Sequence, residues 1–157
     1  MNATARLRLA VHSAQRGVAA VEFAIILTVL VPLLFGTSEF GRAIFQFDAL
    51  TKSVDSGARY LATQAPGDPT AIASATCMVV YGNTACTGNA LVQGLTTQMV
   101  SVCDRTSCAS ANLVTTGQGV INTVTVTISN FQFVSLASGV FPSVTFNPIS
   151  ATFEQVM

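Results

Sequence analysis

The run from Val18 to Phe35 constrains this chain more than any other part of its sequence. Its 18 residues contain a single charged side chain, Glu22. As an α-helix rising about 1.5 Å per residue, the run is about 27 Å long, close to the roughly 30 Å hydrocarbon core of a bilayer. We therefore expect a membrane-spanning helix that carries a carboxylate near its start.

The charges before this run indicate its orientation. Three arginines and no acidic residue precede Val18; they are Arg6, Arg8 and Arg16. Because positive charge favours the cytoplasmic side, the N-terminus is expected to stay in the cytoplasm while the rest of the chain is translocated. The cysteines would then lie in an oxidising compartment, where disulfides form.

An ordinary cleaved secretory signal is an alternative interpretation of this N-terminus. It would combine the basic start, the apolar run and cleavage near the small residues Gly36-Thr37-Ser38. However, the apolar run exceeds the usual length of about 7–15 residues, and Glu22 interrupts it early. The helical pattern also continues past Ser38, so we favour a retained helix.

Residues 39–65 predict an amphipathic extension of the same helix. An apolar stripe recurs at spacings of three and four residues: Phe40, Ile44, Phe47, Thr51, Val54, Ala58 and Leu61. A parallel charged stripe forms two acid-to-base pairs four residues apart: Asp48 with Lys52, and Asp55 with Arg59. We expect much of the apolar stripe to pack against the downstream part of the chain.

The remainder predicts a small antiparallel sheet. Pro66-Gly67-Asp68-Pro69 ends the helix and starts a loop. The clearest strand is 120–129, where valine and isoleucine alternate with threonine. The other expected elements are a helical turn at 71–75 and short strands at 78–81, 98–103, 131–134, 143–146 and 150–156.

Four cysteines, Cys77, Cys86, Cys103 and Cys108, allow three disulfide pairings. Proximity favours Cys77–Cys86 and Cys103–Cys108, each worth about 2–3 kcal/mol in the chain-entropy model. Metal binding is the weaker alternative, because neither spacing is C-x₂-C and the single histidine, His12, precedes the apolar run.

Catalysis and nucleic-acid binding both lack the residues they need. The formal net charge is zero, so the electrostatic attraction that dominates nucleic-acid binding is missing. Downstream of the apolar run there is no histidine to act as a base, and no glycine-rich phosphate loop follows a strand. We therefore predict no catalytic residue, no cofactor, no metal and no enzyme activity.

Three spaced motifs point to a known family. They are Val21-Glu22-Phe23-Ala24, Glu39-Phe40-Gly41-Arg42 and, after Thr51, Gly57-Ala58-Arg59-Tyr60. In this order, over about residues 16–62, they resemble the TadE-like proteins, minor pseudopilins of the tight-adherence (Tad) type IV pilus machinery. The TadG-like group of the same machinery shares a similar anchor but is usually longer.

The N-terminus also resembles a type IV pilin precursor. This resemblance implies that a membrane-embedded prepilin peptidase cuts between Gly17 and Val18, which makes Glu22 the fifth mature residue and Phe23 the sixth. The new α-amine of Val18 would be positive at neutral pH. We hypothesise that Glu22 of a neighbouring subunit pairs with this amine and enforces register, because an unpaired charge among apolar helices is expensive.

The resemblance implies an α+β, pilin-like fold with a long N-terminal helix and a small antiparallel sheet. The expected parts are a basic leader (1–17), a transmembrane segment (18–38), an amphipathic extension (39–65) and an exported, disulfide-bonded β domain (66–157).

The implied function is pilus assembly and surface adherence from the inner membrane, which the chain would cross once. The implied partners are the prepilin peptidase, other minor pseudopilins, the major pilin, the inner-membrane assembly platform and the lipid bilayer, with no nucleic acid. Two alternatives remain: a single-span anchor for an extracytoplasmic binding domain unrelated to pili, and a soluble protein released by signal cleavage near Ser38.

Overall fold

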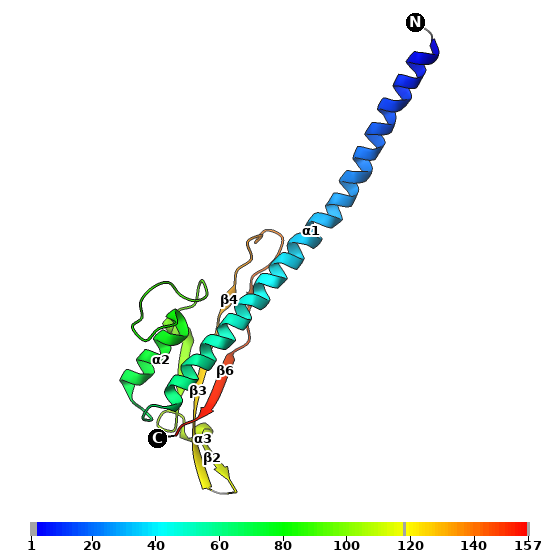
Figure 1. Cartoon of the computed structure of the whole chain (residues 1–157). Helices are drawn as coiled ribbons and strands as arrows, with labels where there is room; N and C mark the ends of the chain where they lie inside the picture. The colour runs from blue at the N-terminus through cyan, green and yellow to red at the C-terminus, as the bar shows by residue number, and fades with distance from the viewer. Residues whose placement is uncertain (1–2, 118, 157) are drawn as a thin grey trace. The chain divides into compact units, whose positions relative to one another are not determined.

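The computed structural model describes residues 3–117 and 119–156, with side chains from residue 17 onward. The described helices are α1 (Ala3–Ala62), α2 (Pro69–Tyr81), the 3₁₀ turn η1 (Thr97–Met99) and α3 (Ala109–Asn112). The described strands are β1 (Val100–Cys103), β2 (Leu113–Thr116), β3 (Gly119–Ile128), β4 (Gln132–Phe133), β5 (Val144–Thr145) and β6 (Ile149–Glu154) (Figure 1). A long N-terminal helix followed by a small antiparallel sheet confirms the predicted α+β class.

The chain divides into two units, one up to Gly41 and one from Arg42 onward. In the first unit α1 is helical from Ala3, so the backbone of the predicted leader is described, whereas the side chains of Arg6, Arg8, His12 and Arg16 lie outside the described ones. From Gly17 α1 is long and apolar enough to cross a membrane, with a mean hydropathy of 2.6 and no buried residue in its most apolar stretch.

Two threonine hydroxyls, one inside the apolar run and one just after it, bond to the helix itself. The hydroxyl of Thr28 donates to the carbonyl of Ile25 at 2.7 Å, and that of Thr37 donates to the carbonyl of Leu34 at 2.9 Å. Lipid offers no hydrogen-bond partner, so polar groups in a span must be satisfied within the protein. These two hydroxyls meet that requirement.

The second unit packs α1 and α2 against the sheet. The core combines residues from α1, α2 and β3 with apolar residues that follow each of them. Its most deeply buried members are Leu50, Val54, Ala58, Leu61, Ala75, Val79, Val80, Val124, Val126, Ile128 and Phe131. The prediction that α1 would pack against the downstream chain is therefore confirmed within this unit.

The buried face of α1 differs in part from the predicted stripe. Val54, Ala58 and Leu61 are buried as expected, but the other predicted members of the stripe are exposed and Leu50 is fully buried. The exposed members are Phe40, Ile44, Phe47 and Thr51. The Thr51 hydroxyl donates to the carbonyl of Phe47 at 2.9 Å, which satisfies it on the solvent side. Leu50 lies one helical turn before Val54, so the buried face continues through Leu50 and not through Thr51.

The predicted charged pairs form on the exposed side of α1. Lys52 lies 2.7 Å from Asp48, and Arg59 lies 2.8 Å from Asp55. Exposed pairs of this kind contribute little, typically about 0.3–0.5 kcal/mol.

Strand β3 organises the sheet, and it confirms the clearest predicted strand. It pairs antiparallel with β1 and β2 and also with β6, while β4 and β5 form a separate two-stranded sheet. Val126 lies opposite Val102 of β1 and Ala151 of β6. The alternating Val124, Val126 and Ile128 are all buried in the core, because successive side chains of a strand point to opposite faces.

The strand predicted at 78–81 is wrong, because these residues form the last turn of α2. The side chain of Asp68 caps α2 by accepting from the amide of Thr70 at 2.9 Å, and Pro69 begins the helix. Gly82, with φ of 74°, ends it by donating to the carbonyl of Met78. A short apolar run is compatible with helix or strand, and here the capping residues decided.

Two further differences lie between α2 and β3. The strand predicted at 98–103 begins with the turn η1 and becomes extended from Val100. The elements α3 and β2 were not predicted. Both belong to a stretch rich in small and polar residues, where hydrophobic periodicity gives little signal.

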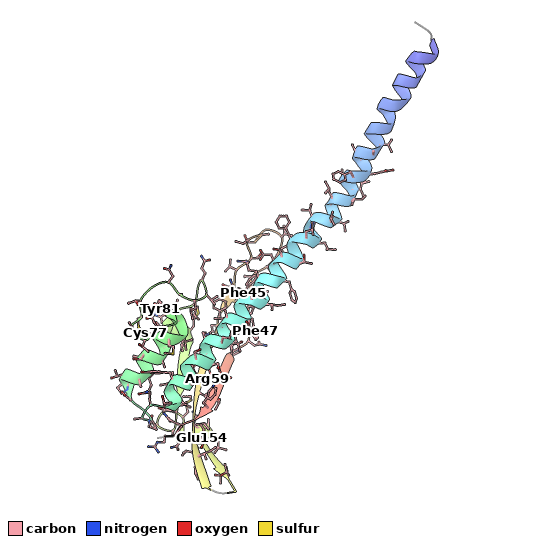
Figure 2. All side chains as sticks on the ribbon, viewed as in Figure 1. Phe45, Phe47, Arg59, Cys77, Tyr81 and Glu154 are labelled. Carbon is pink, nitrogen blue, oxygen red and sulfur yellow. A yellow bond between two sulfur atoms is a disulfide. The ribbon has the colours of Figure 1, made fainter. Side chains whose placement is uncertain are left out.

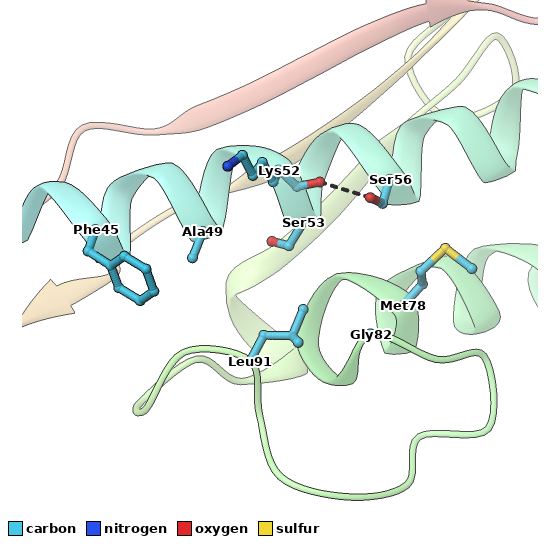
Figure 3. Close-up of a pocket in the computed structure, with 8 residues that line it drawn as sticks. All are labelled: Phe45, Ala49, Lys52, Ser53, Ser56, Met78, Gly82 and Leu91. Carbon is cyan, nitrogen blue, oxygen red and sulfur yellow. Dashed lines mark hydrogen bonds between the residues drawn. The ribbon is translucent and has the colours of Figure 1, made fainter.

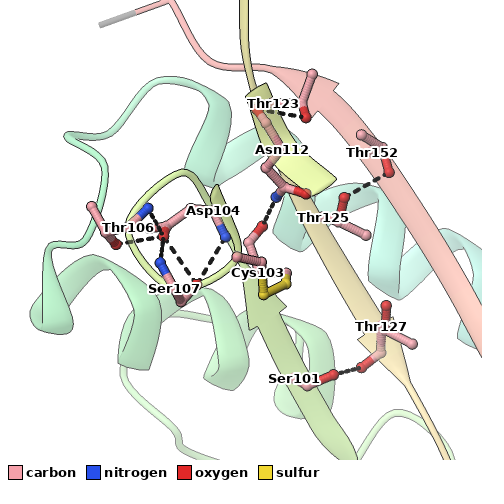
Figure 4. Close-up of a disulfide and its surroundings, with 11 residues drawn as sticks. Ser101, Cys103, Asp104, Thr106, Ser107, Asn112, Thr123, Thr125, Thr127 and Thr152 are labelled. Atoms are coloured by element: carbon pink, nitrogen blue, oxygen red, sulfur yellow. Dashed lines mark hydrogen bonds between the residues drawn. A yellow bond between two sulfur atoms is a disulfide. The ribbon is translucent and has the colours of Figure 1, made fainter. Parts of the chain in front are cut away.

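The cysteines form two local disulfides. Cys77 joins Cys86 with their Cα atoms 4.8 Å apart, and Cys103 joins Cys108 at 5.4 Å. The first ties the end of α2 to the loop that follows it, and the second closes the loop after β1 (Figure 4). This is the neighbouring pairing that proximity favoured.

Asp104, between the second pair of cysteines, organises a buried hydrogen-bond cluster (Figure 4). Its Oδ1 accepts from the amides of Thr106 and Ser107, each at 2.9 Å, and from both hydroxyls. Its Oδ2 accepts from the amide of Gly67 at 2.7 Å, which ties the loop after α1 to the loop after β1. Burial alone would raise the pKa of Asp104, but the hydrogen bonds from Thr106, Ser107 and Gly67 hold that pKa well below its usual range.

We expect Asp104 to make the fold sensitive to acid. A carboxyl whose pKa is lower in the folded state stabilises the fold above its unfolded pKa of about 3.9, and this stabilisation is lost as pH falls toward the folded pKa. The free energy of unfolding should therefore drop between about pH 5 and pH 2 more steeply in the wild type than in Asp104→Asn. Urea titrations in detergent, followed by circular dichroism, would measure both; parallel pH curves would contradict the assignment.

Gly57 marks the closest approach of α1 and α2. A Cβ atom at this position would lie 2.5 Å from Cγ2 of Val79 and 3.4 Å from the carbonyl oxygen of Ala75. Valine is β-branched and stiff, so it cannot move aside easily. Any larger residue would force the two helices apart.

We expect Gly57→Ala to lower the free energy of unfolding by about 1–3 kcal/mol, since overpacking outweighs the roughly 1 kcal/mol gained in helix propensity. In a Val79→Ala background the same change should be much less harmful, because the clashing methyl is gone. Gly41→Ala, on the same helix with no atom within 4 Å, is the matched control and should not destabilise. Equal losses in both backgrounds would contradict this contact.

Candidate functional site

The candidate site is the stretch of α1 that carries the predicted processing residues and the two later motifs. The processing residues Gly17, Val18, Glu22 and Phe23 all lie on the exposed surface of α1 in the first unit. A Cβ atom at Gly17 would meet no atom within 4 Å. These residues are therefore accessible to another molecule, and their role in processing stays a prediction.

Glu22 is surrounded along α1 by apolar side chains. Val21, Phe23, Ile25 and Ile26 are all exposed, so the carboxylate lies on a helix surface that is otherwise apolar. A carboxylate in such a place is expensive in lipid unless a cation or hydrogen-bond donor reaches it. The helix therefore presents one strongly polar contact point near the start of its apolar run.

The Glu39-Phe40-Gly41-Arg42 motif crosses the boundary between the two units. Phe40 and Gly41 are exposed, and Glu39 is half-buried. Arg42 belongs to the second unit, where its guanidinium donates to the carbonyl oxygen of Val134 at 2.6 Å. The same guanidinium lies 4.7 Å above the ring of Phe133 in β4. Arg42 thus joins the start of the second unit's helix to the end of β4.

The Gly57-Ala58-Arg59-Tyr60 motif makes a second set of contacts with the domain. Gly57 faces α2, Ala58 is fully buried, and Tyr60 packs against the core from a half-buried position. Arg59 donates from Nε to Asp55 at 2.8 Å and lies 4.7 Å above the ring of Phe153 in β6. Figure 2 shows Arg59 on the side of α1 that faces β6.

The two arginines hold α1 against the sheet at two places. They are 17 residues apart, which corresponds to about 25 Å along a helix. Each arginine covers an aromatic ring, an arrangement worth about 0.5–1 kcal/mol at exposed sites. The residues of these two motifs in the second unit therefore have structural roles, and they do not converge on a common catalytic point.

A cavity of about 400 Å³ lies between α1 and α2 (Figure 3). It is lined by Phe45, Ala49, Lys52, Ser53, Ser56, Met78, Gly82 and Leu91. The hydroxyl of Ser53 donates to the carbonyl of Leu50, and that of Ser56 donates to the carbonyl of Lys52. Both hydroxyls are thus engaged with their own helix, and the lining contains no carboxylate or imidazole to activate them.

Metal binding finds no matching cluster in the part of the chain that the structure describes. No group of three or more histidine, cysteine, aspartate or glutamate side chains lies close enough there to hold an ion. All four cysteines are engaged in the two disulfides.

Sequence reasoning missed the partners of these motifs and one further residue, Gln155. Its amide donates to the carbonyls of Leu61 at 3.3 Å and Gln64 at 3.0 Å. It thereby adds a hydrogen bond to two carbonyls near the end of α1, of which that of Leu61 also accepts from the amide of Gln64 at 3.0 Å. No local pattern around Gln155 indicates this role, because the groups it meets are more than 90 residues away.

Comparison with known proteins agrees with this picture of α1. The family model described as TadE-like protein matches residues 17–59. The chain matches no curated protein and no solved structure. The matched residues begin at Gly17, include the whole apolar run and end at Arg59, so they form one continuous stretch of α1. Residues 17–59 of this chain are therefore TadE-like, as the three spaced motifs predicted.

Proposed function

We propose that this chain is a minor pseudopilin, a non-enzymatic subunit that supports pilus biogenesis and surface adherence in a Tad-type system. The observation that carries this proposal is the TadE-like match over residues 17–59. The helix that contains these residues exposes apolar side chains and is long enough to cross a membrane. Such a helix needs either lipid or neighbouring helices around it. A pilus subunit uses both in turn.

Maturation is the first step of the proposed function. Residues 1–17 act as a leader, and the prepilin peptidase cuts between Gly17 and Val18. This bond lies within α1, so the helix must open locally to enter a peptidase site. Gly17 favours opening, because glycine within a helix is less stable than alanine by roughly 0.5–1 kcal/mol.

The mature chain is then held by its N-terminal helix. Residues 18–38 span the inner membrane with the N-terminus cytoplasmic, residues 39–65 extend the helix, and residues 66–157 form the domain on the exported side. The two disulfides support this orientation, since disulfides persist in oxidising compartments. The assembly platform, the major pilin and other minor pseudopilins are the proposed partners.

Glu22 gains its partner only after cleavage. In the uncut chain the nitrogen of Val18 is a neutral amide, whereas in the mature chain it is a positive α-amine. The amine of one subunit pairs with Glu22 of a neighbour inside the apolar helix bundle. Since either charge alone is costly there, the pair selects cleaved subunits in one register.

A second candidate is a membrane-anchored binding domain unrelated to pili. The limited extent of the family match supports this second candidate, because the match ends at residue 59 and includes none of the sheet. In that case the N-terminus would remain uncut, and the domain would bind its ligand without any pilus protein.

We expect the chain isolated from membranes to begin at Val18 when its prepilin peptidase is present and at Met1 when it is absent. Intact mass and N-terminal sequencing would measure this. Gly17→Leu should retain the leader, whereas Gly41→Leu on the same helix should still be cut. A start at Met1 in both strains would favour the anchored binding domain, and a start near residue 39 would indicate an ordinary secretory signal.

We expect Glu22→Ala to be cut normally but to lose association with the other pseudopilins, measured by co-purification from detergent-solubilised membranes. A loss of about tenfold or more would correspond to 1.4 kcal/mol or more of binding free energy. Glu22→Asp keeps the charge and should retain most of the association. Wild-type association of Glu22→Ala would show that the pairing is wrong.

A further inference from the structure

The loop between β4 and β5 exposes a cluster of large apolar side chains. Val134, Leu136 and Val140 are 60%, 81% and 67% exposed. No charged residue occurs between Arg105 and Glu154, so nothing in this part of the sequence offsets their apolar character. Contiguous exposed apolar side chains usually mark a surface that contacts another molecule or a membrane.

Three backbone amides of this loop are hydrogen-bonded within the loop. The amide of Ala137 donates to the hydroxyl of Ser135 at 3.1 Å, and Ser135 is buried. The amides of Val140 and Phe141 both donate to the carbonyl of Ala137, at 2.8 and 2.9 Å. These bonds point the apolar side chains outward and lower the penalty for placing the loop in a medium without water.

The base of the loop is anchored to the start of the second unit's helix. The carbonyl of Val134 accepts from Arg42, and Phe133 is stacked against Phe146 with ring centroids 6.3 Å apart. Arg42 follows Phe35, the end of the apolar run, by seven residues. Seven residues span about 10 Å as a helix and at most about 25 Å fully extended. The backbone of Arg42, whose side chain bonds to the loop base, therefore lies at most about 25 Å from Phe35.

The segment of α1 that carries Arg42 also exposes apolar side chains. Ile44 and Phe45 are both exposed, and Phe45 lines the cavity between α1 and α2 (Figure 3). Aromatic and apolar side chains next to a cation are common at the boundary between lipid headgroups and acyl chains. Arg42 supplies such a cation beside the loop.

We propose that the β4–β5 loop inserts Leu136 and Val140 into the headgroup–acyl boundary of the phospholipid bilayer that α1 crosses. This inference rests on the proposed membrane anchor. It gives the domain a second contact with lipid besides the helix itself. Because the span keeps the bilayer within reach at all times, even a weak loop–lipid contact is effectively intramolecular.

Lipid fits this loop better than a protein partner does. Specific protein interfaces carry about one hydrogen bond per 100–200 Å² together with complementary charges. The large exposed side chains of the loop, Val134, Leu136 and Val140, are apolar. The amides of Ala137, Val140 and Phe141 donate within the loop itself. A bilayer surface needs no directional partner, so it matches a loop of this composition.

Introduced tryptophans can test this insertion, because the chain contains no tryptophan of its own. Leu136→Trp reports on the loop, and its high exposure means that the change leaves the core intact. The matched control is Val120→Trp, on an exposed side chain of the β2–β3 hairpin. That hairpin lies at the opposite end of the second unit from the β4–β5 loop (Figure 1). Val29→Trp, within the apolar run, reports on the anchor.

Each full-length variant would be reconstituted into phosphatidylcholine–phosphatidylglycerol vesicles with and without brominated acyl chains. We expect Val29→Trp and Leu136→Trp to show blue-shifted emission and loss of fluorescence in brominated vesicles, whereas Val120→Trp shows neither. If Val29→Trp is quenched and Leu136→Trp behaves like Val120→Trp, the loop insertion is wrong while the anchor stands. If Val29→Trp is not quenched either, the anchor itself fails.

A contact between copies of the chain would give a different result. The emission of Leu136→Trp would then shift to the blue only as the protein-to-lipid ratio rises, without quenching by brominated lipid. That outcome would overturn the lipid contact and assign the loop to self-association.

Discussion

The packing of one face of α1 between Leu50 and Leu61 against α2 and β3 supports the rest of the second unit. Leu50, Val54 and Ala58 are fully buried, and Gly57 lets Val79 of α2 approach the helix backbone. Once this face is covered, Arg42 and Arg59 can each reach an aromatic ring of the sheet. The same helix exposes large apolar side chains from Val18 to Phe40. One helix therefore serves two environments, and its sequence changes from apolar on all sides to amphipathic between them.

The TadE-like match includes residues from both the exposed part and the packed part of α1. The matched residues contain the apolar run, the exposed carboxylate of Glu22 and the two arginine-containing motifs. The arginines and Gly57 hold the helix to its own domain, so they act within the subunit. Glu22 and the apolar side chains face outward, where a bilayer or a neighbouring subunit would meet them. The proposed pseudopilin role uses the second group directly and depends on the first group for a rigid support.

Features set by short sequence separations were predictable, and those set by long separations were not. The alternation in β3, the pairs of charges on α1 and the neighbouring disulfide partners each depend on residues within about ten positions of one another. By contrast, Arg42 meets Val134 across 92 residues and Gln155 meets Leu61 across 94, and spacing contains no information about such contacts. The error at residues 78–81 had another cause. Valine and tyrosine favour strands, but the cap at Asp68 and the left-handed Gly82 enclosed them in a helix.

The contact between Gln155 and the end of α1 also affects when the domain can fold. The side-chain amide of Gln155 donates to the carbonyls of Leu61 and Gln64, and β6 completes one side of β3 just before it. A ribosome adds about 5–20 residues per second, so roughly 5–20 s separate the synthesis of these two parts. During that interval the apolar face around Val54 has no sheet to cover it. The nascent chain therefore passes through a period in which this helix must be shielded by a chaperone or by the membrane itself.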